Sequence, residues 1–153
     1  MSTTDAIDHG IKEINTIEEI QSCYTVLKQL RPHLINETSF VKQIHRQLAQ
    51  GYKLIAYVKN KKVKAVIGFR FLEFLAWGKV LYIDDLITDS ETRKLGYGTK
   101  LLEWVIQQAR NKNCDQVHLD SGPQRYEAHR LYLNHGFKII GYHFAIDMKQ
   151  RRK

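Results

Sequence analysis

The sequence predicts an α/β (α+β) fold, with a central mixed and mostly antiparallel sheet flanked by about four helices. Three apolar or alternating segments, residues 52–59, 63–72 and 79–88, follow one another with very short links. Short links of this kind favour antiparallel neighbours. A helical stripe and a further apolar strand, residues 116–120, come next. A strand that follows a helix tends to run parallel to the strand before that helix, which makes the predicted sheet mixed.

The segments before these strands predict a short first strand at residues 11–14 and two helices. Thr16 is suited to capping a helix, and apolar residues at helical spacing continue over residues 17–30. The second helix is predicted over residues 37–50. Residues 1–9 show no periodicity and are predicted to be a frayed end.

The C-terminal half adds a long helix that ends by Asn113, the buried strand at residues 116–120, and a short helix at residues 124–134. Residues 137–148 are predicted to form one or two final strands. Internal repeats, low-complexity segments and linkers are absent from the sequence, so residues 1–153 are expected to form a single domain.

Composition favours a cytoplasmic protein with a packed core. The chain has 43% apolar residues and 10% aromatics, and no apolar run approaches the roughly 20 residues of a membrane span. The N-terminus lacks the apolar region of a signal peptide. Cys23 and Cys114 offer neither a disulfide framework nor metal-ligand spacing, and Cys114 is read as a buried thiol rather than a nucleophile.

The net charge of +8 suggests that the binding partner is a nucleic acid, a membrane surface or a phosphorylated ligand. The basic residues are scattered, and they form no stripe interleaved with aromatics of the kind a single-strand binder uses. The basic tail, residues 149–153, is read as a solvated end. Nucleic acid is therefore the less favoured partner, and a phosphorylated ligand is preferred.

A loop between a strand and a helix provides the expected anion site. Gly96 and Gly98 lie where the strand at residues 80–88 gives way to the helix, and Arg93 and Lys94 precede them. A helix N-terminus has free N–H groups and the positive end of the helix dipole. The spacing fits neither a Rossmann fingerprint nor a Walker A loop. A phosphate or pyrophosphate is predicted on residues 94–99, although glycines at such a position can also serve only to turn the chain.

Two motifs together resemble the GNAT acyltransferases (Gcn5-related N-acetyltransferases). Arg93-x-x-Gly96-x-Gly98 resembles that family's pyrophosphate loop. Ala128-x-x-x-Tyr132-x-x-x-Gly136-Phe137 resembles its second motif. The resemblance implies a GNAT-like fold with splayed parallel central strands. It also implies an N-acetyltransferase that uses acetyl-CoA as co-substrate, transfers the acetyl group directly to a primary amine and needs no metal.

The resemblance also assigns residues to the co-substrate. Main-chain groups of Leu86, Ile87 and Thr88 would hold the pantetheine arm and thioester, and a backbone N–H near Ile87 would serve as the oxyanion donor. The pyrophosphate would rest on a continuous run consisting of Arg93, Lys94, Leu95, Gly96, Tyr97, Gly98 and Thr99.

Tyr132 matches the family's tyrosine that lies near the CoA sulfur and acts as general acid, although it could also be a core aromatic. A base is needed as well, because a primary amine is protonated near neutral pH. Asp84 and Asp85 are neighbours on an apolar strand, so they are predicted to point to opposite faces. Asp85, on the side of Ile83 and Ile87, is the predicted base. The alternatives are that both acids pair with Arg or Lys, or that Glu73 or a water removes the proton.

One position departs from the family pattern. Many members have an asparagine three residues before the alanine of the second motif, where it contacts the pantetheine arm, and here that residue is Arg125. Arg125 could serve the same arm, line the acceptor pocket or pair with Asp120. His129, on the same predicted helix, is read as a surface or packing residue.

Two other functions stay open from the sequence. The chain could be a non-catalytic acyl-CoA-binding sensor or regulatory module, although a phenol at Tyr132 favours an enzyme. A basic protein that binds nucleic acid is the second. Family analogy also allows a homodimer through the C-terminal strands. It places residues 30–40 near the amine, but no residue identifies the acceptor.

Overall fold

The structure is a computed structural model that describes residues 10–149. The expectations for residues 1–9 and for most of the basic tail lie outside the described residues. Contacts divide the chain into two compact units, one up to Leu119 and one from Asp120 onward. Each unit is described below by itself.

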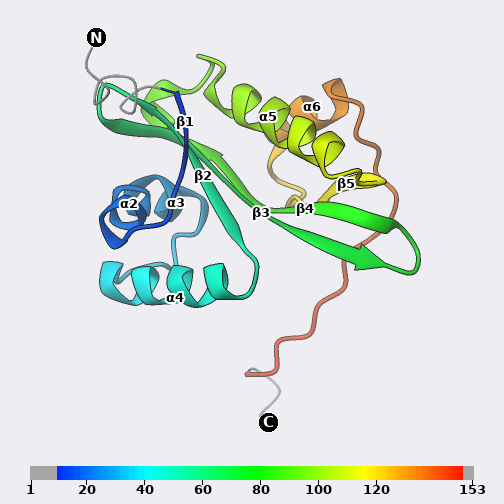
Figure 1. The fold of residues 1–153 in the computed structure, drawn as a ribbon, viewed down its shortest axis with the longest axis horizontal. Coiled ribbons are helices and arrows are strands. Elements are labelled where there is room, and N and C mark those ends of the chain that lie inside the picture. The colour runs from blue at the N-terminus through cyan, green and yellow to red at the C-terminus, as the bar shows by residue number, and fades with distance from the viewer. Residues whose placement is uncertain (1–9, 150–153) are drawn as a thin grey trace. The chain divides into compact units, whose positions relative to one another are not determined.

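The first unit is built on a five-stranded sheet in the order β1-β2-β3-β4-β5. Neighbouring strands are antiparallel except for β4 and β5, which are parallel, so the prediction of a mixed, mostly antiparallel sheet is confirmed (Figure 1). The strands are β1 (Gly10–Glu13), β2 (Lys53–Lys59), β3 (Lys62–Phe74), β4 (Gly78–Thr88) and β5 (Gln116–Leu119).

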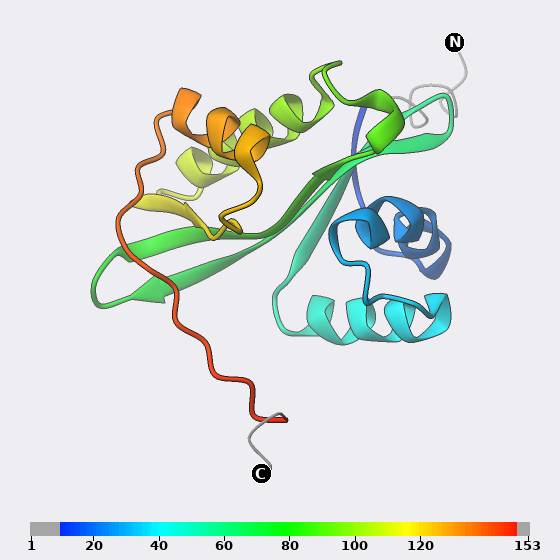
Figure 2. The same ribbon diagram turned by 180° about the vertical axis from the view of Figure 1, so that it is seen from behind.

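Helices cover both faces of this sheet (Figures 1 and 2). Three helices lie on one face, α2 (Ile17–Ser22), α3 (Tyr24–Leu30) and α4 (Glu37–Ala49), and α5 (Tyr97–Asn111) lies on the other. The single helix predicted over residues 17–30 is divided at Cys23, where the N–H bonds to the Ile20 carbonyl three residues back. This division accounts for the difference from the predicted set of about four helices. A buried core of aliphatic and aromatic side chains fills the space between α2–α4 and the sheet.

The predicted cap at Thr16 is confirmed as a reciprocal capping box. The Thr16 hydroxyl accepts from the Glu19 N–H at 3.2 Å, and the Glu19 carboxylate accepts from the Thr16 N–H at 2.9 Å. Burial alone would raise the pKa of Glu19, but the hydrogen bonds from Thr16 and Asn15 and the nearby Lys12 lower it to about 2. The carboxylate therefore stays charged at the positive end of the helix dipole.

The register between β3 and β4 shifts by one residue at one point, and this shift determines how the two acidic residues of β4 are arranged. Gly68 of β3 pairs with Asp85, but the next residue, Phe69, pairs with Ile83. Asp84 is therefore an extra residue on β4. This arrangement is a β-bulge, and it interrupts the alternation of side chains between the two faces of the sheet.

The strand β5 is shorter and less buried than predicted. It ends at Leu119 rather than Asp120, and its residues are half-buried or exposed. The prediction that it is parallel to the preceding strand is confirmed, but it pairs only with the part of β4 from Val80 to Ile83. A four-residue strand at the edge of a sheet presents only one edge to a neighbour, which limits its burial.

Among its described residues, 120–149, the second unit contains one helix, α6 (Tyr126–Asn134), close to the predicted bounds. The prediction of one or two strands over residues 137–148 is wrong, since the structure has no strand between Phe137 and Lys149. Apolar residues do recur at every second position from Ile140 to Met148. Alternation is a local pattern, however, and a strand also needs a partner backbone to take up its N–H and C=O groups.

Candidate functional site

The last part of β4 runs on without a partner from β5. Residues from Asp84 to Thr88, which we call the free end of β4, pair with β3 alone. On the other edge, no residue of β5 takes up their main-chain groups. The free end contains Leu86, Ile87 and Thr88, the residues predicted to hold the pantetheine arm. An extended ligand with amide groups can add to such an edge as a strand would.

The chain then turns into α5 through the predicted anion loop. A short 3-10 turn, η1 (Ser90–Thr92), precedes residues Arg93 to Leu95, whose side chains are exposed. Lys94 and Gly96 both have left-handed backbones, with φ of 71° and 84°. Gly96 is the residue before the helix, and no side chain caps α5. The first N–H groups of α5 are therefore available to an anion beside two cationic side chains.

The two glycines of the loop have different surroundings. A Cβ built on Gly96 would meet nothing within 4 Å, so this position is open to a ligand. A Cβ on Gly98 would lie 2.7 Å from the Thr88 hydroxyl oxygen, so Gly98 lets α5 approach β4 closely. Tyr97 and Gly98 are buried, whereas Thr99 is half-buried. Gly96 therefore leaves the backbone accessible, and Gly98 places the helix against the free end of β4.

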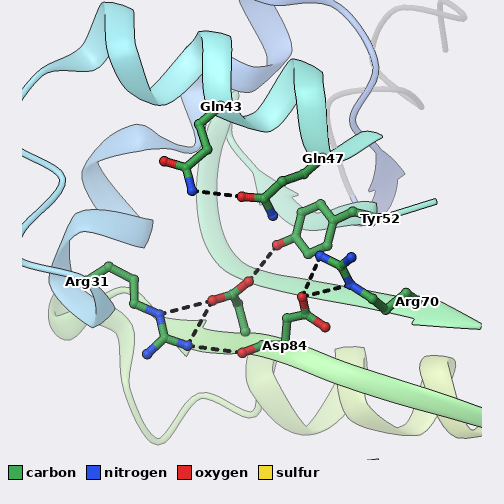
Figure 3. Close-up of polar contacts among 7 residues, drawn as sticks. Arg31, Gln43, Gln47, Tyr52, Arg70 and Asp84 are labelled. Carbon is green, nitrogen blue, oxygen red and sulfur yellow. Dashed lines mark hydrogen bonds and ion pairs between the residues drawn. The ribbon is translucent and has the colours of Figure 1, made fainter. Parts of the chain in front are cut away.

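The two acids of β4 both face the side of the sheet covered by α2–α4, so the prediction that they point to opposite faces is wrong. Asp84 Oδ2 pairs with the Arg70 guanidinium at 2.8 Å. Asp85 accepts from Arg31 Nε at 3.1 Å and from the Tyr52 hydroxyl at 2.7 Å. The Arg70 guanidinium lies 5.3 Å from the centre of the Tyr52 ring, which joins the two pairs into one cluster (Figure 3). The bulge at Asp84 is the physical reason.

Asp85 was predicted to lie on the same face of the sheet as Ile83 and Ile87, but in the structure it shares a face with Ile87 only. Ile87 belongs to the core under α2–α4. Ile83 pairs with Phe69, whose ring packs against Trp104 of α5 with the ring centres 6.3 Å apart. Paired residues of neighbouring strands share a face, so Ile83 lies on the α5 side. The alternation that linked Asp85 to Ile83 is broken by the bulge.

The arrangement of the acids depends on a close approach between Tyr52 and Gly68. A Cβ on Gly68 would lie 1.7 Å from the Tyr52 hydroxyl oxygen, so only glycine leaves room for the ring there. Burial and the negative charge of Asp85 raise the pKa of Tyr52 well above its ordinary value. The phenol therefore stays protonated and donates a hydrogen bond to Asp85. Burial also raises the pKa of Asp84, although Arg70 opposes the shift.

Three residues of this cluster, Arg31, Tyr52 and Arg70, were missed from the sequence. Gly68 carried a usable signal, because an isolated glycine inside a strand often marks a bulge or a close approach. Of the alternatives for the base, Glu73 lies opposite Lys79, five residues along β3 from Gly68. At about 3.3 Å per residue this is roughly 17 Å from the acids, so Glu73 is not part of the cluster.

The end of α3 also holds the start of the anion loop. The Gln29 amide donates to Asp89 Oδ1 at 3.0 Å and accepts from the Ser90 N–H at 2.9 Å. Two residues on, Arg31 bonds to Asp85 and to the Asp84 carbonyl. The end of α3 therefore fixes the free end of β4 on both sides, at the acids and at the entry to the loop.

Replacing Gln29 with leucine is expected to weaken the binding of acetyl-CoA, the co-substrate expected from the sequence, by at least about fivefold. Each lost hydrogen bond is worth roughly 0.5–1.5 kcal/mol, and without both of them the loop must be ordered at the expense of binding. Calorimetric titration checks this, with Gln21→Leu as the control for an exposed glutamine on α2. Equal affinities for the wild-type protein and Gln29→Leu would show that the loop does not depend on α3.

The second unit contains the remaining predicted residues. Tyr132 is buried, and its ring packs edge to face against Phe137, with the ring centres 5.9 Å apart. Burial raises the pKa of Tyr132, so its phenol stays protonated at neutral pH, as a general acid must. Arg125 precedes α6 and does not pair with Asp120, which instead contacts His143 at 3.3 Å. His129 bonds to the Gly122 carbonyl at 2.8 Å, as expected of a packing residue.

Neither cysteine is placed for nucleophilic catalysis. Cys23 is buried and its pKa is raised to about 12 by burial. Cys114 is half-buried rather than buried, and burial raises its pKa as well. Residues 10–149 contain no group of three His, Cys, Asp or Glu side chains that could hold a metal ion. Within the same residues, no helix has the length and apolar character needed to cross a membrane.

Comparisons with known proteins show which family the chain resembles. The model of the acetyltransferase (GNAT) family matches residues 15–137. The chain is 33% identical to YhdJ, an uncharacterised N-acetyltransferase of Bacillus subtilis, over 88% of this chain and 95% of that protein. A GNAT family acetyltransferase of Staphylococcus aureus has a similar fold, with a TM-score of 0.75 and 20% identity over 90% of this chain and 97% of that one. A predicted acetyltransferase of Clostridium acetobutylicum, in a crystal structure with acetyl-CoA, has a TM-score of 0.71 and 15% identity, over 94% and 98% of the two chains. The chain therefore belongs to the GNAT family of acetyltransferases.

Proposed function

We propose that this N-acetyltransferase moves the acetyl group of acetyl-CoA directly to a primary amine of a small molecule or protein. The observation that carries the proposal is the free end of β4, which has an unpaired edge and leads directly to the uncapped N-terminus of α5. An unpaired strand edge suits the amides of pantetheine, and an uncapped helix N-terminus suits its pyrophosphate. The open position at Gly96 supports the same fit.

The co-substrate would be held by two runs of residues. Main-chain groups of Leu86, Ile87 and Thr88 would bind the pantetheine arm, and one of their N–H groups would stabilise the negative charge that develops on the carbonyl oxygen. The pyrophosphate would lie on residues 93–99, with charge supplied by Arg93 and Lys94. Arg125, where many relatives have asparagine, is proposed to contact the same arm.

The ammonium form of the amine must lose two protons, one before the attack and one as the amide forms, and the sulfur gains one. Acetyl-CoA, when bound, supplies the acetyl group as a thioester. A carboxylate first takes a proton from the ammonium group and releases it to solvent. The neutral nitrogen then forms the new C–N bond as the C–S bond breaks, the carboxylate takes the second proton, and Tyr132 gives its proton to the thiolate. Asp85 is the base favoured by the sequence. Asp84 is a second candidate, because its Oδ1 has no partner among residues 10–149 whereas both oxygens of Asp85 are engaged.

The location and assembly of the protein are part of the same proposal. Two free cysteines fit a reducing compartment, so we place the enzyme in the cytoplasm. A homodimer is proposed on family analogy alone.

Calorimetry with acetyl-CoA and desulfo-CoA tests the proposal. Wild-type protein is expected to bind both with micromolar affinity, because both carry the pyrophosphate. Gly98→Trp is expected to abolish binding, since even a Cβ at this position crowds Thr88. Arg93→Gln combined with Lys94→Gln changes only exposed side chains, and we expect it to weaken binding by at least about tenfold.

Release of free thiol in the presence of amines then separates catalysis from sensing. Binding without turnover of any primary amine would favour the sensor or regulatory module. Failure of wild-type protein to bind either CoA compound would contradict both functions.

A further inference from the structure

The cluster around the β-bulge contains charges of both signs in equal number. We call Arg31, Tyr52, Arg70, Asp84 and Asp85 the bulge cluster. Its two guanidinium groups and two carboxylates form two ion pairs, Arg31 with Asp85 and Arg70 with Asp84, and Arg31 also bonds to the Asp84 carbonyl. It occupies the α2–α4 side of β4, directly at the free end to which the acetyl group is assigned.

The ion pairs of the cluster leave hydrogen-bonding groups unused. Arg31 bonds through Nε and one terminal nitrogen, and Arg70 does the same. Within residues 10–149, the second terminal nitrogen of each arginine has no partner, and neither does Asp84 Oδ1. The Arg31 side chain is 43% exposed, against 24% for Asp84. Because both side chains reach the surface, a ligand can approach these groups.

We propose that the acceptor is a small primary amine that also carries an anionic oxyacid group, so that both charges of the ligand are matched in the bulge cluster. This inference rests on the proposed function. The ammonium group lies at Asp84 Oδ1, and the anionic group lies at Nη1 of Arg31, the one nitrogen of this guanidinium without a partner among residues 10–149. Arg31 also bonds to the Asp84 carbonyl at 3.0 Å, so the two binding positions flank the same residue.

Charge balance disfavours the other classes of amine. A polyamine would meet two guanidinium groups beside the two carboxylates, and a like charge close by is unfavourable. An uncharged or purely apolar amine would leave Nη1 of Arg31 unused. An anionic group, by contrast, can accept a charge-assisted hydrogen bond from this nitrogen.

Arg31, rather than Arg70, is assigned to the anionic group for two reasons. Arg70 lies over the Tyr52 ring, and both of its hydrogen bonds go to Asp84, so it positions that carboxylate. Arg31 is the more exposed of the two. Gln43 and Gln47 of α4 are on the side of that helix that faces the cluster (Figure 3), and their amides bond to each other at 2.9 Å. Their amide groups make the surroundings of the cluster polar.

The test is a comparison of acceptors of matched length. β-Alanine and 3-aminopropylphosphonate carry an amine and an anionic group, propylamine carries the amine alone, and 1,3-diaminopropane carries two amines. We expect kcat/KM for the two zwitterions to exceed that for propylamine by about 10- to 100-fold, the range for hydrogen bonds to a charged group. In Arg31→Gln all four amines share any loss that comes through Asp85. The advantage itself, measured as the ratio of kcat/KM for each zwitterion to that for propylamine, is expected to disappear through a rise in KM.

Two further variants make the comparison specific. Lys28→Gln removes one exposed positive charge from the same helix and is expected to leave the preference intact. Arg31→Lys keeps the charge but loses the bonds through Nε and Nη2 that hold the side chain in place, so part of the preference is expected to remain. The wild-type comparison does not depend on any variant folding, and thermal unfolding shows whether Arg31→Gln is intact.

The outcomes also separate this inference from the proposed function. Equal or better use of propylamine or 1,3-diaminopropane by the wild-type enzyme would overturn the inference while the acetyltransferase reaction stands. An equal loss for all four amines in Arg31→Gln would also overturn it, because the arginine would then act only through Asp85. Failure to bind acetyl-CoA would instead contradict the proposed function.

Discussion

Tyr132→Phe is expected to lower kcat by about 10²- to 10⁴-fold, the usual contribution of a positioned general acid, while acetyl-CoA affinity changes little. The phenol is buried, and burial raises its pKa, so the proton to be donated is present throughout the neutral range. Removing only the hydroxyl keeps the ring that contacts Phe137 at 5.9 Å. The loss should therefore appear in turnover rather than in stability, and thiol release under saturating acetyl-CoA measures it.

The raised pKa of Tyr132 also predicts how activity depends on pH. A group whose pKa is raised keeps its proton to higher pH, so wild-type activity should not fall through loss of the Tyr132 proton until well above neutral pH. Tyr126→Phe, on the same helix but with an exposed side chain, is the matched control and should retain wild-type turnover. Retention of full turnover by Tyr132→Phe would assign Tyr132 to the core rather than to catalysis.

Gly68→Ala is expected to destabilise the protein by about 1–3 kcal/mol, the usual cost of adding volume to a filled site. The new methyl group would overlap the Tyr52 hydroxyl, with a Cβ to oxygen distance of 1.7 Å. Tyr52 is buried and bonded to Asp85, so its ring cannot leave without exposing apolar surface and breaking that bond. Urea denaturation of the variant measures the change in the free energy of unfolding.

A double-mutant cycle identifies the cause. In a Tyr52→Ala background the clash is gone, so Gly68→Ala is expected to cost much less there, with a coupling energy within about 0.5–3 kcal/mol. Gly141→Ala is the control, because its Cβ would meet nothing within 4 Å and its φ is not positive. An equal cost of Gly68→Ala in both backgrounds would show that the effect comes from the backbone rather than from Tyr52.

Local patterns in the sequence determined most of the fold. The alternation of apolar and polar residues predicted the bounds of β2, β3 and β4 to within one or two residues. The helix cap at Thr16 was also predicted correctly. The anion loop was also evident, because a helix N-terminus preceded by Gly96 has the same free N–H groups wherever it occurs. These features depend on neighbours in the chain, which the sequence displays directly.

The geometry of the acidic pair depended on contacts between distant parts of the chain. One extra residue in β4 turned Asp84 and Asp85 toward the same face, and a bulge is set by pairing with β3 rather than by β4 itself. Arg31 and Tyr52 reach Asp85 from 54 and 33 residues away. The missing C-terminal strands have the same explanation. Alternation from Ile140 to Met148 gives a strand its faces but not a partner, and only tertiary structure supplies the backbone with which it pairs.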